Sequence, residues 1–429
     1  MSKHLIICLD GTWCDGDSAD PQTNIRLLSD ILDPKPEGGS EQRIYYNAGV
    51  GTGGFLDRIA GGVFGKGLSA NVLAAYRFLS QFYEPGDKIY VFGFSRGAFT
   101  ARSLCGFLSA SGLLTQDMCN AANQEFAWNY YRTPPKKRYP ADRARLRRIT
   151  HNNPEARIRF LGVFDTVGAL GIPQSFMSWI GRRAIHFHDT EVSSVVDHSC
   201  QALAIDEYRL EFEPAVWTEP RHRKYQTVEQ VWFPGSHANI GGGCADTDLS
   251  DLALIWMLQR LRRHCPEVGF TWKEPLLERF GRYPSCTGKI FDPRSWIFWR
   301  SRWRPTIRSI NRCEPGRRWL SRLFKPRPHS WPIGEMVHQS AVQRWEQTKD
   351  ERRRHRYQPP NLLAAIESRK TVVVGFDGEP ISAVGRSVGN GAQTARAEES
   401  PPPRAVNGDG HAVMLPTEQG AEQPQPQLH

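Results

Sequence analysis

The chain has 429 residues, of which 39% are hydrophobic and 11% aromatic, and this composition supplies enough apolar material for a large core. The nine cysteines are odd in number and contain no Cys-x-x-Cys pair, which argues against a disulfide framework and against a zinc ribbon. The net charge of +10 predicts attraction to anionic surfaces.

The chain opens with "MSKHLIICLDGTW", which contains one short apolar run. This run is too short for the core of a signal peptide, and no other stretch approaches the roughly 18 apolar residues of a membrane span. We therefore expect a soluble protein made in the cytosol, and export without a signal peptide stays open.

The first elements of the chain alternate between strand and helix patterns. Residues 4–10 and 43–49 are short and β-rich, which is typical of buried strands. Residues 69–83 carry apolar side chains at helical spacing, beginning at a serine cap and ending before Pro85 and Gly86. A strand, a helix and a strand in succession predict right-handed βαβ units and a largely parallel sheet.

The next strand leads into a Gly-x-Ser-x-Gly pentapeptide with Ser95 at its centre. A helix with one apolar stripe follows, so Ser95 is expected at a strand-to-helix junction. Gly93 and Gly97 suit such a nucleophile elbow, because the strand and the helix approach each other closely there. Chance could also produce the pentapeptide, so the pattern needs partners elsewhere in the chain.

Two later strand candidates, residues 157–165 and 228–237, each end in a polar side chain. These side chains are Asp165 and His237. A helix follows from about Asp248 or Ser250. The repeated order of strand then helix predicts an α/β fold with a mostly parallel central sheet flanked by helices.

A serine hydroxyl becomes a useful nucleophile when an imidazole takes its proton and a carboxylate fixes the tautomer of that imidazole. In the α/β-hydrolase arrangement the serine comes first in the chain, followed by the acid and then the histidine, each at the carboxyl edge of the sheet. Ser95, Asp165 and His237 follow this order. We predict that they are the nucleophile, the acid and the base.

The negatively charged intermediate of such a reaction needs backbone donors. The N–H of Arg96, at the start of the helix after the pentapeptide, is one predicted donor. The "LDGTW" turn offers the second, from Gly11 or Thr12. Asp10 in the same turn is interpreted as a turn former and organiser of this loop rather than as a metal ligand.

Several sequence blocks resemble an uncharacterised α/β-hydrolase family related to type VI secretion phospholipase effectors. The blocks are "LDGTW" at 9–13, "GFSRGAFTAR" at 93–102, "FDTVGALG" at 164–171, "ALAIDEYRLEFEPAVW" at 202–217 and "VWFPGSHANIGGG" at 231–243. The resemblance covers residues 5 to about 345. It implies an α/β-hydrolase fold, the triad Ser95, Asp165 and His237, and lipase activity on phospholipid esters in the characterised secreted relatives. One position departs from the family pattern, since Asn239 stands where Asp is common.

Each assignment has rivals within the chain. Asp206 and Glu207 are the alternative acids, and Asp165 could instead cap the turn after its strand. His338 is the alternative base, although a packed helix residue is the favoured reading. The glycine-rich stretch 49–54 fits a loop over the site better than a nucleotide cradle. Three nearby carboxylates favour helix capping over a calcium loop, because an EF-hand's glycine and terminal glutamate are missing: Asp246, Asp248 and Asp251.

The segment 289–327 holds twelve Lys or Arg against two acidic residues, and it is also rich in tryptophan. Arginine with tryptophan is typical of a membrane interface, because indoles lie at headgroup depth and guanidinium groups pair with lipid phosphates. The predicted lipid contacts are Trp296, Trp299, Arg300 and Trp303. A solvated insertion remains the alternative, and nucleic acid would tolerate the same residues but is not the expected partner.

We expect one α/β-hydrolase catalytic domain over residues 1–370, with a basic aromatic insertion at 289–331. Residues 371–429 are poor in aromatic residues and are expected to form a flexible low-complexity tail. The predicted function is a serine esterase or lipase that needs no metal or organic cofactor. The alternative is a catalytically silent adaptor that binds an anionic membrane or nucleic acid. The lipid head group, the acyl position and the oligomeric state stay open.

Overall fold

The computed structural model describes fifteen stretches of the chain. They are residues 2–11, 22–49, 63–151, 156–167, 191–209, 212–218, 226–271, 279, 284–292, 305–311, 332–348, 356–368, 371–383, 404–406 and 412–414.

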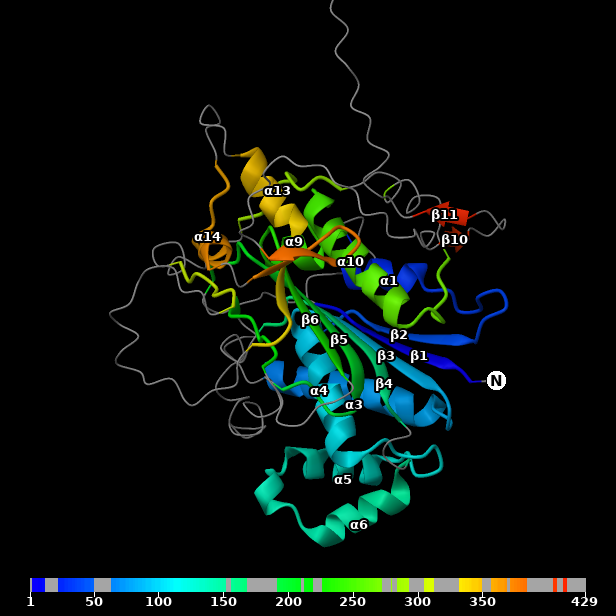
Figure 1. Ribbon diagram of the computed structural model, residues 1–429. Helices are drawn as coiled ribbons and strands as arrows, with labels where there is room; N and C mark the ends of the chain where they lie inside the picture. The colour runs from blue at the N-terminus through cyan, green and yellow to red at the C-terminus, as the bar shows by residue number, and fades with distance from the viewer. Residues whose placement is uncertain are drawn as a thin grey trace, which may run out of the picture.

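The centre of the described part is a nine-stranded sheet in the order β2-β1-β3-β4-β5-β6-β7-β8-β9 (Figure 1). All neighbouring strands in it are parallel except the last pair, β8 and β9. The strands are β1 His4–Leu9, β2 Gln42–Asn47, β3 Lys88–Phe94, β4 Ile158–Phe164, β5 Val196–Ala204, β6 Thr227–Phe233, β7 Glu335–His338, β8 Val372–Val374 and β9 Pro380–Ala383. The predicted α/β fold with a mostly parallel central sheet is confirmed.

Helices cover both faces of this sheet (Figure 1). One face packs against α1 (Asn24–Ile31) and α10 (Asp248–His264), and the other against α3 (Val63–Phe82) and α4 (Arg96–Ser111). Strand β1 is apolar on both faces, because Ile6 and Cys8 join the first core cluster while Leu5, Ile7 and Leu9 join the second. Because β3, β4, β5 and β6 run parallel, the carboxyl ends of β3, β4 and β6 lie at the same edge of the sheet.

A helical excursion at the far end of α4 has no counterpart in the sequence analysis. It consists of α5 (Ala121–Arg132), the short 3₁₀ helix η1 (Pro135–Lys137) and α6 (Pro140–Ile149). Its inner side packs on α4, where Trp128 lies edge to face with Phe107. In Figure 1, α5 and α6 lie at the bottom of the view, below α4.

The C-terminal half adds a third, smaller core cluster beside β6 and β7. The helices α13 (Gln339–Gln347) and α14 (Pro360–Glu367) contribute Ala341 and Leu362 to it. The short helix α9 (His237–Gly241) follows β6 directly.

Two sequence expectations need correction. The helix expected over 69–83 begins earlier, at Val63. The tail expected from residue 371 is wrong at its start, because β8 and β9 extend the sheet to Ala383. The valines of β8 explain this, since two of the three are buried against their neighbours. Further along, β10 (Arg404–Val406) and β11 (Ala412–Met414) form a separate antiparallel pair.

No helix in the described stretches is both long enough and apolar enough to cross a bilayer.

Candidate active site

Ser95 occupies the turn between β3 and α4. Its backbone has φ 56° and ψ −119°, a conformation that residues other than glycine rarely adopt. Its N–H donates to the Phe164 carbonyl at 3.1 Å. Gly93 and Gly97, on either side of Ser95, leave no room for a Cβ atom. A Cβ on Gly97 would lie 2.0 Å from the Leu9 carbonyl oxygen, and one on Gly93 would lie 2.6 Å from the Gly97 oxygen. This close junction holds the Ser95 side chain at the carboxyl edge of the sheet.

His237 lies just beyond the end of β6, as the first residue of α9. The preceding turn is fixed by a capping box, in which Asn239 accepts from the Ser236 N–H at 3.1 Å. The imidazole Nε2 lies 2.8 Å from Ser95 Oγ, and Nδ1 lies 2.6 Å from Asp165 Oδ2. The structure thus brings together the three side chains that the sequence order selected.

Asp165 directly follows β4 and is fully buried. Like Ser95 it has a positive φ, 38°. Its Oδ1 accepts from the Ala204 N–H at 3.0 Å, while its Oδ2 accepts from His237. The acid is thus held by the neighbouring strand β5 as well as by the imidazole, and the hydrogen bond to Nδ1 favours the tautomer in which Nε2 can accept the serine proton.

Arg308 contacts Asp165, although no sequence pattern pointed to this arginine. Its Nη1 donates to Asp165 Oδ1 at 2.6 Å and its Nη2 to Asp165 Oδ2 at 3.0 Å, so the guanidinium grips both oxygens. The arginine side chain is only 2% exposed. It belongs to the basic segment that was interpreted as a membrane-binding insertion, and nothing in its local pattern separates it from the other arginines there.

The electrostatics of the site match a resting base and an ionised acid. Burial opposes ionisation of Asp165, but the Arg308 charge and the His237 hydrogen bond outweigh it and hold the pKa of that carboxyl well below its usual range. Burial lowers the pKa of His237, and the contacts with Asp165 offset this only in part. The rings of Phe94 and Phe212 flank the imidazole at 4.8 and 4.9 Å between centroids and exclude water from it.

The three predicted oxyanion donors lie in different surroundings. Arg96 is the first residue of α4, so its N–H lies at the positive end of that helix. Gly11 approaches the nucleophile closely, because a Cβ built on it would lie 3.5 Å from Ser95 Cβ. The Gly11 N–H, however, donates to Asp10 Oδ1 at 2.7 Å, so the prediction of Gly11 as a donor is not supported. Thr12 lies outside the described residues.

Asp10 itself behaves as the expected loop organiser. Besides Gly11 it accepts from the hydroxyls of Thr23 and Tyr46, at 2.5 and 2.9 Å. Burial raises the pKa of Asp10, and these hydrogen bonds oppose the rise. Its carboxylate ties the turn after β1 to α1 and β2.

The rival acids and base take other partners. Asp206 accepts from the Gly235 N–H at 2.7 Å and from the Tyr357 hydroxyl at 2.9 Å. Glu207 pairs with Arg209 at 2.8 Å and accepts from the His237 backbone N–H at 3.3 Å. These two carboxylates therefore shape the loops around the imidazole rather than contact its ring.

His338 is packed, as expected, but it is the last residue of strand β7 and not the helix residue that the sequence analysis favoured. It caps α13 by accepting from the Ser340 N–H and stacks on Phe233 with 4.5 Å between ring centroids. Burial lowers the pKa of His338 to about 3, so this imidazole stays neutral.

No group of three or more potential metal-binding side chains gathers in the described parts of the chain. Asp251 is bound instead by Thr247 and by Arg279, while Asp246 accepts from the Asp248 N–H in the first turn of α10. The N-cap residue of α10 is Thr247, which makes no side-chain cap hydrogen bond, so the expected capping is met by Asp246 only in part. The predicted lipid contacts lie outside the described residues: Trp296, Trp299, Arg300 and Trp303. The stretch 49–54 lies outside them from residue 50 on.

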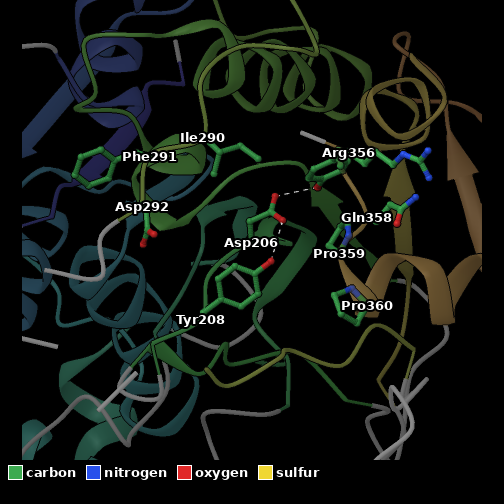
Figure 2. A pocket seen from close by; sticks show the side chains of 10 residues that line it. Asp206, Tyr208, Ile290, Phe291, Asp292, Arg356, Gln358, Pro359 and Pro360 are labelled. Carbon is green, nitrogen blue, oxygen red and sulfur yellow. Dashed lines mark hydrogen bonds between the residues drawn. The ribbon is translucent and has the colours of Figure 1, made fainter. Parts of the chain in front are cut away.

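A cavity of about 340 Å³ opens beside the site (Figure 2). Asp206 and Tyr208 line it from the turn after β5, Phe291 and Asp292 from a second segment, and Arg356 from a third. The backbone N–H of Phe291 donates to Asn239 at 2.9 Å, which links this wall to the loop that carries His237. The cavity therefore combines aromatic and charged side chains next to the candidate active site.

Comparisons with known proteins place these residues in a wider group. Residues 3–260 match the family model described as "T6SS, Phospholipase effector Tle1-like, catalytic domain". A curated but uncharacterized protein of Saccharomyces cerevisiae is 32% identical over 235 residues, which is 50% of this chain and 33% of that protein.

Two solved structures are also similar to this chain. One is the Tle1 effector bound to the VgrG spike of the type 6 secretion system, with 19% identity, a TM-score of 0.35 and coverage of 57% of this chain and 52% of that one. The other is an uncharacterized protein from Pseudomonas aeruginosa, with 15% identity, a TM-score of 0.39 and coverage of 86% and 53%. The chain thus spans about a third of the yeast relative and about half of each solved chain.

Proposed function

The chain belongs to the family of Tle1-like phospholipase effector catalytic domains, and from this premise we propose that it is a serine hydrolase that cleaves the carboxylic esters of acyl lipids, phospholipids among them. The observation that carries the proposal is the line of two hydrogen bonds from Ser95 through His237 to Asp165, at 2.8 and 2.6 Å. The three residues come from the ends of three strands, where an α/β-hydrolase uses them.

The proposed reaction begins when Ser95 Oγ attacks the acyl carbonyl carbon while His237 Nε2 takes the hydroxyl proton. The buried carboxylate of Asp165 stabilises the imidazolium that forms. The carbonyl oxygen becomes an oxyanion, which the N–H of Arg96 at the start of α4 is placed to receive. His237 then gives its proton to the leaving alcohol, and an acyl-enzyme remains on Ser95.

In the second half of the reaction, water attacks the acyl-enzyme. His237 takes a proton from this water, the second oxyanion collapses, and Ser95 leaves with the proton that the imidazole returns. Every proton in this cycle is moved by side chains of the chain itself, and the scheme calls for no metal or organic cofactor.

The substrate class rests on the family, whose description names a phospholipase effector. The surface charge is consistent with it, because the net charge of +10 favours contact with an anionic membrane. We propose peripheral association with such a membrane. The silent-adaptor alternative would keep this association without any turnover.

A lipid-class hydrolysis profile tests the proposal. Wild-type protein is incubated with p-nitrophenyl esters and with phospholipid vesicles, and released fatty acid is measured beside Ser95→Ala and Ser109→Ala. Ser109 lies on the same helix and bonds to Ser194 at 3.0 Å, away from the imidazole, so its variant is a matched control. We expect turnover by wild type and by Ser109→Ala alone. Equal turnover by all three proteins, or vesicle binding with no turnover, contradicts the proposal.

A further inference from the structure

The carboxylate of Asp165 is saturated by four hydrogen bonds. Arg308 supplies two of them, at 2.6 and 3.0 Å, the Ala204 N–H supplies one at 3.0 Å, and His237 supplies one at 2.6 Å. Asp165 is 0% exposed and Arg308 is 4% exposed, so water does not compete for these positions. The plane of the carboxylate, and with it the direction of the His237 hydrogen bond, is fixed from two sides.

Arg308 is itself anchored to the main chain. Its Nη1 also donates to the Ala204 carbonyl at 2.9 Å, and its Nη2 donates to the Phe212 carbonyl. On either side of it, the Thr306 N–H donates to the Tyr208 carbonyl and Ile310 is fully buried in the third core cluster. Residues 305–311 of the basic segment are thus part of the active-site wall.

A buried carboxylate beside a neutral imidazole is costly unless a cation compensates it. A guanidinium suits this position because it keeps its charge at every working pH and its planar fork matches both carboxylate oxygens. The imidazole alone cannot do so, since it is charged for only part of the reaction.

We propose that Arg308 is a positioning residue of the candidate active site, which keeps Asp165 ionised and holds its Oδ2 on His237 Nδ1. The inference rests on the proposed hydrolase function. It also assigns a role in catalysis to one arginine of the basic segment, separate from any contact of that segment with lipid.

Two effects follow when Arg308 is removed. Asp165 loses half of its hydrogen bonds and can rotate, so kcat falls by about 10- to 100-fold, less than the loss on the order of 10⁴ expected when the acid itself is removed. The uncompensated charge of Asp165 also favours the imidazolium, which raises the pKa of His237. Because the neutral imidazole is the base, the acid limb of the kcat/KM profile moves to higher pH by about 1 to 2 units.

The other charges facing the imidazole stay in place in this comparison. They are Glu207, which favours the imidazolium, and Arg209, which opposes it, and these two are paired with each other. A shift of the limb therefore reports the Arg308 to Asp165 contact.

The experiment measures kcat, KM and the pH profile on a soluble ester for Arg308→Lys, Arg308→Met, Asp165→Asn and the double variant. Lysine keeps the charge but cannot grip both oxygens, so its acid limb should stay close to wild type while kcat falls. If Arg308→Met is poorly folded, the double variant removes both charges and restores a neutral core. In the Asp165→Asn background, Arg308→Met should change kcat by less than about threefold, because the carboxylate through which Arg308 acts is already absent.

Arg279→Met is the matched control, since Arg279 grips Asp251 at 2.6 Å outside the triad. It should lower the melting temperature without moving the acid limb. The inference is wrong if Arg308→Lys and Arg308→Met both retain the wild-type profile and kcat, or if Arg308→Met lowers kcat equally in both backgrounds. An inactive wild type would instead overturn the proposed function.

Discussion

Two residues of the site, Ser95 and Asp165, have strained backbone conformations, and the imidazole of His237 between them is buried. Ser95 and Asp165 both adopt a positive φ, at 56° and 38°, which aims their side chains at the same imidazole. Their partners keep them there, since the Ser95 and Asp165 N–H groups donate to carbonyls of β4 and β5. Strain at two residues that contact the same imidazole is typical of a functional site.

The pH dependence of the serine's reactivity should reflect the burial of His237. Burial lowers the pKa of His237 from its ordinary value of 6.5, so the neutral base persists below that pH. The half-maximal point of the reactivity should therefore lie below pH 6.5, at the lowered pKa of His237. The rate of acylation by a soluble ester against pH measures this, and a half-maximal point above 6.5 would contradict the assignment.

We expect Asn239 to stabilise the folded chain more than an aspartate at the same position would. Its Oδ1 accepts from the Ser236 and Phe291 N–H groups, and its Nδ2 donates to the Lys289 carbonyl at 3.1 Å. Asn239→Asp replaces that donor with a carboxylate oxygen facing a carbonyl, which should lower the free energy of unfolding by about 1–3 kcal/mol. Denaturant unfolding checks this, and an unchanged midpoint would show that the contact with Lys289 is dispensable.

The close packing of α4 against β1 sets the position of Ser95 at the start of that helix. Gly97→Ala should unfold or inactivate the protein, because the new Cβ would lie 2.0 Å from a backbone oxygen of β1. Gly106→Ala on the same helix is the control, since its Cβ would meet nothing nearer than the Tyr131 hydroxyl at 3.3 Å. Thermal unfolding and ester turnover of both variants test this, and a stable, active Gly97→Ala protein would count against the close junction.

The elements also explain what could be predicted from the sequence. Ser95, Asp165 and His237 each follow an apolar run that forms a parallel strand, so strand ends alone suggested that they meet. Arg308 follows no strand and shares its pattern with many neighbouring arginines, so only the fold reveals its partner. β8 is a run of three valines in a stretch poor in aromatic residues, which explains why the tail boundary was placed too early.

At the scale of the whole molecule, the positive charge is concentrated rather than spread. Besides the segment 289–327, residues 132–148 hold eight Lys or Arg against one Asp, and they form the excursion of η1 and α6. Six of these cations are exposed, and Tyr139 between them is 72% exposed. This surface is joined through α5 to α4, and its exposed charge can contribute to the proposed membrane association.

Removing charge from this surface should weaken vesicle binding in proportion. Arg143→Gln with Arg147→Gln should lower partition onto anionic vesicles by about 30-fold at low salt, if each arginine contributes about 1 kcal/mol. Lys35→Gln with Arg263→Gln removes the same charge elsewhere and should have a smaller effect. Vesicle sedimentation measures both, and equal partition of the two double variants would remove the excursion from the binding surface.

The central claim is that Ser95 is a nucleophile activated by His237. Covalent labelling with a fluorophosphonate, followed by mass spectrometry of the labelled peptide, tests it most directly. We expect one adduct, on Ser95, that is absent from Ser95→Ala and forms slowly in His237→Gln. A wild-type protein that stays unlabelled, or whose adduct lies on another residue, would contradict the account.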